Sequence, residues 1–337
     1  MAYSCPEGSD RIRPRGDRTL TEEVAPGIHQ IDTEAFGNPR LIASYLIQGS
    51  ERSALIDPGF PSSLPTVLAR LEELEFDVRK LDYIIATHTH IDHAGAIGEL
   101  ARLAPESRVV VHGRGSYYLR NPAKIAGGGK SVFSPEISSR FGEVEGVERS
   151  RILPVSDGDI VDLGKEKLTV FYSPGHSTDH ISLYEKESSA VITGDTFCLH
   201  YPELADVLIP AGSPPIYQTK LILAELKRLS ELDIKTVLTP HFGKASTQDP
   251  QKFIQQNITT VENTRNDIKE LFSQGLEFHQ LVETLRDRVL DGSGKPAEEI
   301  PPFLRDTWLR AMLRVGLMGY MADILEYARN PRPFHGL

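Results

Sequence analysis

The chain has 337 residues, of which 39% are hydrophobic and 25% charged, as in a globular protein with a large buried core. Its formal net charge of −10 argues against a surface that binds nucleic-acid phosphates, because such a surface needs clustered Lys and Arg. We therefore expect no nucleic-acid partner. No apolar run approaches the roughly 20 residues that span a bilayer, so we expect no membrane partner either.

The two cysteines, Cys5 and Cys198, are too few for a disulfide framework and exclude a zinc site made of thiolates. The N-terminal segment is polar and lacks the apolar stretch of a secretory signal. Both observations predict a cytoplasmic location.

The sequence pattern divides the chain into three parts. Residues 1–20 are polar and rich in Arg, and are predicted to form a flexible tail. Residues 21–248 alternate short β-type runs with turn residues and helical stretches, whereas residues 249–337 show helical patterns and no convincing strand. We predict one α/β domain over 21–248, followed by a helical C-terminal region over 249–337.

Short apolar runs bounded by turn residues predict the strands, and apolar residues at helical spacing predict the helices. The expected strands are 27–32, 42–49, 53–59, 81–87, 108–112, 150–155, 159–164, 167–177, 180–185, 189–195 and 234–243. The expected helices are 63–76, 95–105, 216–232, 248–275, 276–290 and 301–329. Residues 113–145 contain GGGK and several Ser and Pro with little periodicity, so we expect an irregular insertion that acts as a functional loop or lid.

Three histidines and an aspartate lie within six residues directly after the expected strand 81–87, in the sequence THTHIDHAG of residues 87–95. Imidazole nitrogens and carboxylate oxygens are the ligands that a catalytic zinc or iron uses. In a loop, His88 and His90 alternate and can face one centre, while Asp92 and His93 can turn toward a second. One short stretch can therefore serve two metal ions, provided that distant residues complete both ligand sets.

Three later strands each end in a lone residue that can bind a metal, flanked by Gly or Pro. His176 follows Pro-Gly at the end of 167–177, Asp195 follows Gly at the end of 189–195, and His241 follows Pro near the end of 234–243. This is the arrangement expected for a site built on one edge of a sheet.

The HxHxDH stretch and the three strand ends occur in an order that resembles the metallo-β-lactamase superfamily, over roughly residues 24 to 245. The resemblance implies an α/β (α+β) fold, a four-layer αβ/βα sandwich with two mixed sheets face to face and helices outside, here with a C-terminal helical extension. It also implies the metal ligands: His88, His90 and His176 would bind a first ion, Asp92, His93 and His241 a second, and Asp195 would bridge them.

The lactamases proper use a Cys at the position of Asp195, so the resemblance favours the branch of glyoxalase II-type thioesterases and N-acyl homoserine lactonases. Two divalent ions that share a water generate hydroxide at neutral pH, and no protein nucleophile is needed. The bridging hydroxide would attack an acyl carbonyl while the ions stabilise the oxyanion. Asp92 is the predicted catalytic residue, which passes a proton to the leaving group. We expect two zinc ions, with iron or manganese as alternatives, and a small-molecule thioester or lactone as substrate.

Three other functions remain open at this point. Some superfamily members resemble persulfide dioxygenases, which hold a single iron through the positions of His88, His176 and Asp195; the complete second ligand set weighs against this. A phosphodiesterase or nuclease could use the same two-metal centre, although the acidic balance is unfavourable. A non-enzymatic scaffold would be expected to lose ligands, and none is missing.

Several residues near the ligands have two interpretations. Asp57 resembles the family's DPG element and either orients a ligand imidazole or only starts a turn. His180 and His200 could line the pocket, although structural roles are favoured, and Cys198 is expected to be a packed core thiol. The remaining set comprises tyrosines near the expected mouth of the site, for which aromatic packing is favoured over a hydrogen bond to the substrate oxyanion: Tyr117, Tyr118, Tyr201 and Tyr217.

The C-terminal helices carry an apolar stripe formed by Trp308, Leu309, Met312, Leu313 and Leu317. This stripe is expected to face either the main domain or a second subunit, so a homodimer through these helices is one expectation. We assign the choice of substrate to residues 113–145 together with the C-terminal helices.

Overall fold

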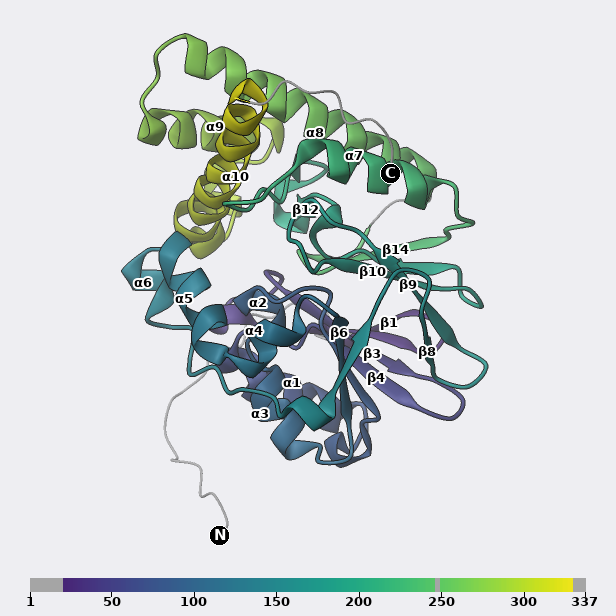
Figure 1. The fold of residues 1–337 in the computed structure, drawn as a ribbon. Coiled ribbons are helices and arrows are strands. Elements are labelled where there is room, and N and C mark those ends of the chain that lie inside the picture. The colour runs from purple at the N-terminus through teal and green to yellow at the C-terminus, as the bar shows by residue number, and fades with distance from the viewer. Residues whose placement is uncertain (1–20, 246–248, 330–337) are drawn as a thin grey trace.

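The computed structural model describes residues 21–245 and 249–329. Two β-sheets lie face to face in the centre of the molecule (Figure 1). The first sheet has seven strands in chain order: β1 (Thr21–Ala25), β2 (Ile28–Asp32), β3 (Ala43–Gln48), β4 (Ser53–Ile56), β5 (Tyr83–Ile85), β6 (Arg108–His112) and β7 (Ile152–Val155). Pairing is antiparallel from β1 to β4 and parallel from β4 to β7, so the carboxyl ends of β4 to β7 share one edge.

The second sheet has six strands in the order β15-β14-β11-β10-β9-β8. These strands are β8 (Ile160–Asp162), β9 (Lys167–Tyr172), β10 (Ile181–Glu185), β11 (Ala190–Ile192), β14 (Thr236–Thr239) and β15 (Gly243–Lys244). Strands β11 and β14 are parallel, and both end at the same edge. A small hairpin of β12 (Leu199–His200) and β13 (Leu208–Ile209) follows β11.

Helices cover the outer faces of both sheets (Figure 1). Helices α1 (Leu64–Glu73) and α3 (Ile97–Leu103) lie outside the first sheet, and α7 (Thr219–Ser230) and α8 (Pro250–Ser273) outside the second. Each buries a stripe at helical spacing; α7, for example, buries Ile222, Leu226 and Leu229. The four-layer sandwich predicted from the sequence is confirmed. Every expected strand and helix has a counterpart, with β1, β15 and the β12–β13 hairpin in addition.

The prediction that residues 113–145 are irregular is wrong. The segment forms α4 (Ser116–Arg120), α5 (Pro122–Val132) and α6 (Pro135–Ser138). Pro122 begins α5, where its missing N–H costs nothing, and the buried Ile125 and Gly129 lie one turn apart on the inner face. Tertiary packing of that face outweighs the low helix propensity of the GGGK stretch.

Within residues 249–329, the C-terminal region contains three α-helices, as predicted: α8, α9 (Phe278–Gly292) and α10 (Leu309–Arg329). A π-helical turn over Phe303–Trp308 precedes α10. They pack against the second sheet and the insertion (Figure 1). The domain boundary at 248 and the tail 1–20 with Cys5 remain predictions, because residues 1–20 and 246–248 lie outside the described residues.

The apolar stripe expected around Trp308 faces the main domain. Trp308 and Leu309 are fully buried within the chain. The Trp308 ring stacks on Phe133 at 6.0 Å between ring centroids, and its Nε1 donates to the hydroxyl of Tyr201 at 2.8 Å. The homodimer stays a prediction, and it would have to use other side chains of these helices.

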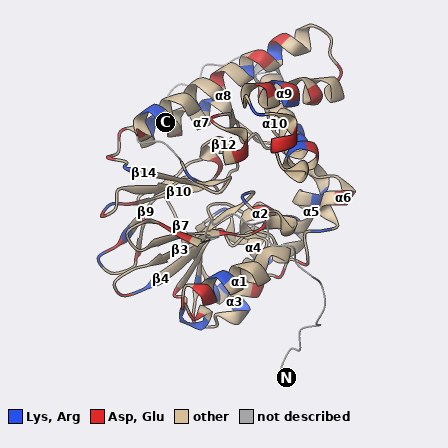
Figure 2. Ribbon diagram, turned by 180° about the vertical axis from the view of Figure 1, so that it is seen from behind, with Lys and Arg blue, Asp and Glu red and all other residues tan. Residues whose placement is uncertain are grey.

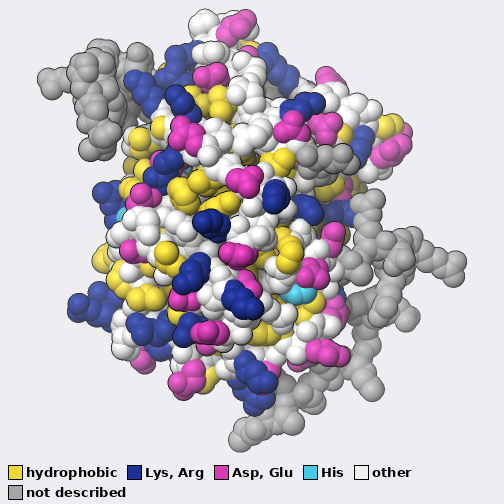
Figure 3. Space-filling view, turned by 90° about the vertical axis from the view of Figure 1, so that its right-hand side faces the viewer, with side chains coloured by type: hydrophobic (Ala, Val, Ile, Leu, Met, Phe, Trp, Pro, Cys, Tyr) yellow, Lys and Arg dark blue, Asp and Glu magenta, His cyan; other side chains and the backbone are white. Residues whose placement is uncertain are grey.

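Charged side chains lie mainly on the outer helices and loops (Figure 2). Figure 3 shows the face of the molecule that lies on the right-hand side of Figure 1, and basic and acidic side chains are interspersed on it. Among the described residues, no helix combines the length and the hydropathy needed to cross a bilayer.

We expect Trp308→Ala to lower the free energy of unfolding by about 3–5 kcal/mol, because it opens a cavity between the C-terminal region and the insertion. Urea denaturation followed by circular dichroism measures the change. Phe272→Ala is the matched control, since Phe272 is 54% exposed, and it should cost less than about 0.5 kcal/mol. Equal losses in the two variants would contradict the docking of this region through Trp308.

Candidate metal centre

All seven predicted ligand residues lie together at the edge where the two sheets meet. His88 and His90 follow β5, and Asp92 and His93 lie in the short helix α2 (Ile91–Ala94). The other three follow strands of the second sheet: His176 follows β9, Asp195 follows β11 and His241 follows β14. Six of these side chains are buried and that of His90 is partly buried.

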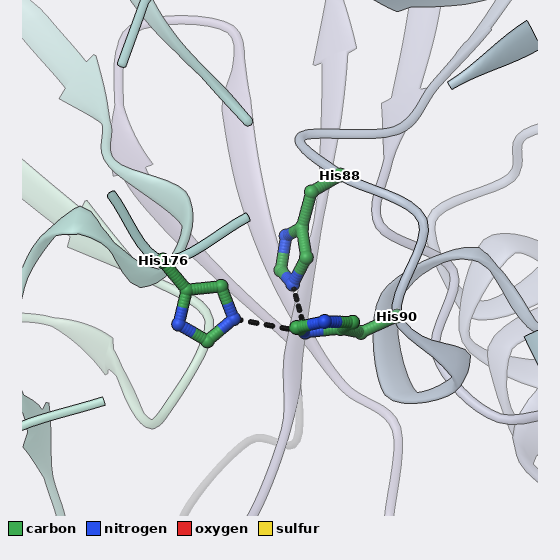
Figure 4. Close-up of side chains that lie close together, drawn as sticks. All are labelled: His88, His90 and His176. Carbon is green, nitrogen blue, oxygen red and sulfur yellow. Dashed lines mark hydrogen bonds between the residues drawn. The ribbon is translucent and has the colours of Figure 1, made fainter. Parts of the chain in front are cut away.

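The first group of donors consists of His88, His90 and His176. The Nε2 atoms of His88 and His176 each lie 2.8 Å from Nδ1 of His90. Figure 4 shows the rings of His88 and His176 pointing toward His90 from two directions. Three ring nitrogens that converge from three sides form one face of a tetrahedral metal site.

The second group consists of Asp92, His93 and His241, whose donor atoms lie within 4.8 Å of one another. One carboxylate oxygen of Asp92, Oδ2, lies 3.7 Å from Nε2 of His93 and 3.6 Å from Nε2 of His241. The Nε2 atom of His93 is buried and has no hydrogen-bond partner among the described residues. An orphaned buried nitrogen is costly unless a ligand satisfies it, and a metal ion would do so.

Asp195 lies between the two groups. Its Oδ2 is 3.4 Å from Nε2 of His176 and 3.5 Å from Nε2 of His93, while its Oδ1 is 3.6 Å from Nε2 of His241. One carboxylate therefore faces imidazoles of both groups, which is the geometry that a bridging ligand requires.

Backbone carbonyls select the tautomer of two histidines. Nδ1 of His176 donates to the carbonyl oxygen of Ala211 at 2.6 Å, and Nδ1 of His241 donates to that of Leu41 at 3.3 Å. With the proton held on Nδ1, the lone pair of Nε2 is directed into the centre.

Asp57 orients the imidazole of His93 directly and that of His88 through Thr87. This favours a role in orienting ligands over a role in a turn alone. Its Oδ2 accepts hydrogen bonds from Nδ1 of His93 at 3.0 Å and from the Thr87 hydroxyl at 2.7 Å. The Thr87 oxygen in turn lies 3.1 Å from Nδ1 of His88. The Thr87 hydroxyl thereby links the Asp57 carboxylate to His88 of the first group. The position of Thr87 in the sequence did not reveal this role.

The protonation preferences of His88 and His90 fit metal binding, and the surroundings of His93 carry an excess of negative charge. Burial lowers the pKa of His88 well below its ordinary value and lowers that of His90 to about 4, and nearby imidazoles act in the same direction. Burial also disfavours the charged form of His93, but three neighbouring carboxylates outweigh it and raise its pKa. Neutral imidazoles are the form that binds a metal, and the excess of carboxylate charge around His93 attracts a cation.

Asp179, which sequence reasoning missed, holds two of the ligand loops in place. The buried carboxylate of Asp179 accepts from N and Oγ1 of Thr89, between His88 and His90, and from the hydroxyl of Ser177. No motif marked Asp179, because its partner Thr89 is 90 residues away in the sequence.

His180 supports the backbone at Asp195, as its favoured structural interpretation predicted. Its Nε2 accepts from the Asp195 backbone N–H at 2.8 Å. Gly194 has φ +50°, and a Cβ there would lie 2.4 Å from the imidazole, so glycine is required. His200 is also buried; its ring nitrogen lies 3.3 Å from the Gly243 carbonyl, and neither histidine lines the cavity described below. Cys198 is a buried thiol whose pKa burial raises, consistent with a core position.

A cavity of about 260 Å³ opens beside the centre. His90, Asp92, His176, Asp195 and His241 form one end of it. Helix α5, the loop 210–216 and one face of α10 supply the other walls, so the insertion and the C-terminal region both contact the space where a substrate would lie.

The candidate tyrosines separate into two pairs. Tyr201 and Tyr217 are buried away from the cavity, and their hydroxyls contact Trp308 and Tyr320 respectively. Tyr117 and Tyr118 are exposed, and Tyr118 lines the cavity. A hydrogen bond to the substrate is therefore restricted to Tyr118 within this set.

A two-sheet αβ/βα sandwich with buried His and Asp donors at one edge defines a class of metal-binding proteins that are mostly hydrolases. A sequence model of the Metallo-beta-lactamase superfamily matches residues 37–241. The chain belongs to this superfamily. The family and the donor set together imply divalent metal ions.

Comparisons with individual proteins agree with this assignment. The chain is 26% identical over 238 residues to the metallo-beta-lactamase fold-containing protein ST1585 of Sulfurisphaera tokodaii, covering 70% of this chain and 86% of that protein. It is 28% identical over 193 residues to the human acyl-coenzyme A thioesterase MBLAC2, covering 52% of this chain and 64% of that protein. The crystal structure of the archaeal superfamily protein ST1585 from Sulfolobus tokodaii has a TM-score of 0.65 at 24% identity, over 88% of this chain and 98% of that chain, and shares the fold.

We expect Asp57→Ala to bind zinc about 10–100-fold more weakly than the wild type, because His93 and Thr87 lose the carboxylate that orients them. Competition with a chromophoric chelator measures the affinity, and circular dichroism checks the fold. Asp82→Ala is the control: Asp82 accepts from the Ser53 backbone at the opposite end of β4, at 2.8 Å, and its loss should leave zinc affinity unchanged. An Asp57→Ala protein with wild-type affinity would contradict the orienting role.

Helix α10 supports the loop that holds His176. A Cβ at Gly319 would lie 2.4 Å from the backbone nitrogen of Ser213, so the helix backbone packs directly on the loop that includes Ala211. We expect Gly319→Ala to displace this loop and to alter the visible absorption spectrum of the cobalt-substituted protein, which reports ligand geometry.

Gly316→Ala is the matched control for Gly319→Ala. A Cβ at Gly316 meets its nearest neighbour, the carbonyl oxygen of Pro210, at 3.5 Å, an ordinary contact. Both substitutions raise helix propensity by about 1 kcal/mol, so a spectral difference between them isolates the contact with Ser213. Identical spectra would show that α10 does not position the ligand loop.

Proposed function

We propose that this protein is a dinuclear metal-dependent hydrolase that cleaves a small acyl substrate, a thioester or a lactone. The observation that carries the proposal is the convergence of two donor groups, with Asp195 between them, at one end of a cavity with largely apolar walls. The proposed metal ligands are the seven residues His88, His90, Asp92, His93, His176, Asp195 and His241.

Divalent ions held by these residues, with zinc as the proposed metal, would supply a water-derived nucleophile at neutral pH and would polarise the acyl oxygen. The chain's own contribution is to orient the donors through Asp57, Thr87 and two backbone carbonyls, and to limit the access of water by burial.

Asp92 is the proposed proton carrier. Its carboxylate lines the cavity and accepts no hydrogen bond from the described residues, in contrast to Asp57 and Asp179, which are saturated by donors. Only one of its oxygens faces the imidazoles of the second group. The other is available to take a proton and deliver it to the leaving group.

Thioester or lactone substrates are supported by the apolar walls of the cavity, which suit an acyl group. The similarity to the human acyl-coenzyme A thioesterase favours the thioester, although that relative is matched over 64% of its length. These observations also support the assignment to the glyoxalase II and lactonase-like branch.

A mononuclear iron dioxygenase is the alternative, since His88, His176 and Asp195 would suffice for it. The second group of donors is complete and includes the orphaned Nε2 of His93, which favours two ions. Metal analysis of protein purified without added metal separates the two functions. One iron per chain together with oxygen uptake would overturn the hydrolase proposal.

We expect Asp92→Asn to lower kcat for the best substrate by about 10²–10⁴-fold, because the amide cannot carry the proton. The assay is a panel of thioesters, lactones, β-lactams and phosphodiesters with zinc-, manganese- and iron-loaded protein. Tyr217→Phe is the control, since its hydroxyl contacts Tyr320 and lies outside the cavity, and it should retain wild-type kcat. Undiminished turnover in an Asp92→Asn protein that retains its metals would contradict the assigned role.

A further inference from the structure

The cavity beside the metal centre has a buried, mainly apolar interior and a solvent-exposed mouth. Among its lining residues, Ile91, Ile125, Phe133 and Leu199 are buried and form the interior. The exposed lining residues, which mark the mouth, include Tyr118, Lys124, Gly128, Ser131 and Ile216. A substrate therefore meets mainly apolar side chains in the interior, whereas the mouth mixes apolar and polar side chains and carries the ammonium group of Lys124.

Helix α10 closes the apolar interior opposite α5. Met312 and Val315 lie one helical turn apart and both line the cavity. Two contacts hold this helix and its preceding turn to α5: the Arg314 guanidinium donates to the carbonyl of Val132, and Trp308 stacks on Phe133. The length available to an apolar acyl chain is thus limited by a wall that is anchored to the carboxyl end of α5.

The volume limits what can enter. Small-molecule sites typically measure roughly 300–1,000 Å³, and this cavity has about 260 Å³. An acyl group fits such a space, but a large conjugate does not. The carrier to which the acyl group is joined must then extend through the mouth.

Lys124 is the only Lys or Arg among the described residues that line the cavity. It is exposed on α5 and forms no ion pair with the described residues. The acidic residues that line the cavity are Asp92, Asp179 and Asp195, and all three are buried: two lie in the metal centre, and Asp179 is saturated by Thr89 and Ser177. The ammonium charge at the mouth is therefore uncompensated and available to a ligand anion.

We infer that the cavity selects acyl conjugates with two parts, a short apolar acyl group and an anionic carrier. Met312 and Val315 limit the acyl group, and Lys124 binds a phosphate or carboxylate of the carrier. The inference rests on the proposed hydrolase function and names the substrate class of the same site.

The charge of the carrier is tested with paired probes that have the same butyryl group, the anionic coenzyme A thioester and the neutral N-acetylcysteamine thioester. We expect Lys124→Ala to raise the ratio of the KM for butyryl-coenzyme A to the KM for the neutral thioester about five-fold, because it removes a partly exposed ion pair. Lys124→Glu should raise this ratio further. The shift should fall as salt is added. Lys130→Ala is the control, because Lys130 lies on the same helix and does not line the cavity.

A third probe, the N-acetylcysteamine thioester of succinate, carries its anion on the acyl part. If Lys124→Ala raises the KM of this probe and leaves that of the coenzyme A thioester unchanged, the anion belongs to the acyl group and the inference is wrong. An unchanged ratio for all probes also overturns it.

The limit that Met312 and Val315 set on the acyl group is tested with thioesters of increasing acyl chain length. Met312→Ala should shift the preferred length by two or more carbons upward, whereas Met318→Ala, on the same helix but outside the cavity, should not. An unchanged length preference in Met312→Ala would contradict the assigned wall.

Failure of the inference is distinguishable from failure of the proposed function. If the wild type hydrolyses the neutral thioester but Lys124 has no effect on the ratio, only the inference fails. If the wild type hydrolyses no thioester, calorimetry with the non-hydrolysable butyryl-coenzyme A thioether still tests Lys124, through a five-fold weaker Kd in Lys124→Ala.

Discussion

The hydrogen bonds to the buried carboxylate of Asp57 are the interaction on which the metal centre depends. Asp57 directly follows β4 in a left-handed conformation, with φ +51°. Its two oxygens accept from the Thr87 backbone, the Thr87 hydroxyl and His93. This one group joins a sheet end to both parts of the HxHxDH stretch. Without it, the imidazoles of His93 and His88 would lose their orientation. Three buried donor groups of Thr87 and His93 would also lose their acceptor, which is costly.

A second constraint is that the donors come from both sheets. The loop that contains His241 is tied to the first sheet by the Ala43 backbone N–H, which donates to the Pro240 carbonyl, and by the Tyr45 hydroxyl, which donates to the Thr239 carbonyl. The site therefore exists only when the sandwich is assembled. Several imidazoles and carboxylates packed in so small a volume are poorly solvated, and bound cations are the natural compensation for the carboxylate charge.

Local signals in the sequence predicted the strands and the candidate donors, whereas the four-layer sandwich was implied by the resemblance to the superfamily. Short apolar runs mark the strands. Four donors cluster in the stretch after β5, and the three later donors, His176, Asp195 and His241, each follow Gly or Pro at a strand end. The insertion could not be predicted, since its helices depend on contacts of Ile125 and Gly129 with distant segments and not on propensity. The roles of Thr87 and Asp179 in holding the ligand residues were missed for the same reason, because hydrogen bonds between distant segments produce no periodic pattern in the sequence.

The position of α10 in the chain bears on how the protein is made. All seven donors precede this helix, yet it packs on the loop that fixes His176 and closes the wall at Met312. During synthesis on the ribosome, the donor-bearing strands emerge first and the segment that secures them emerges last. Until then the centre lacks one of its supports, so a nascent chain stalled before residue 309 would present metal-binding side chains without the geometry of the finished site.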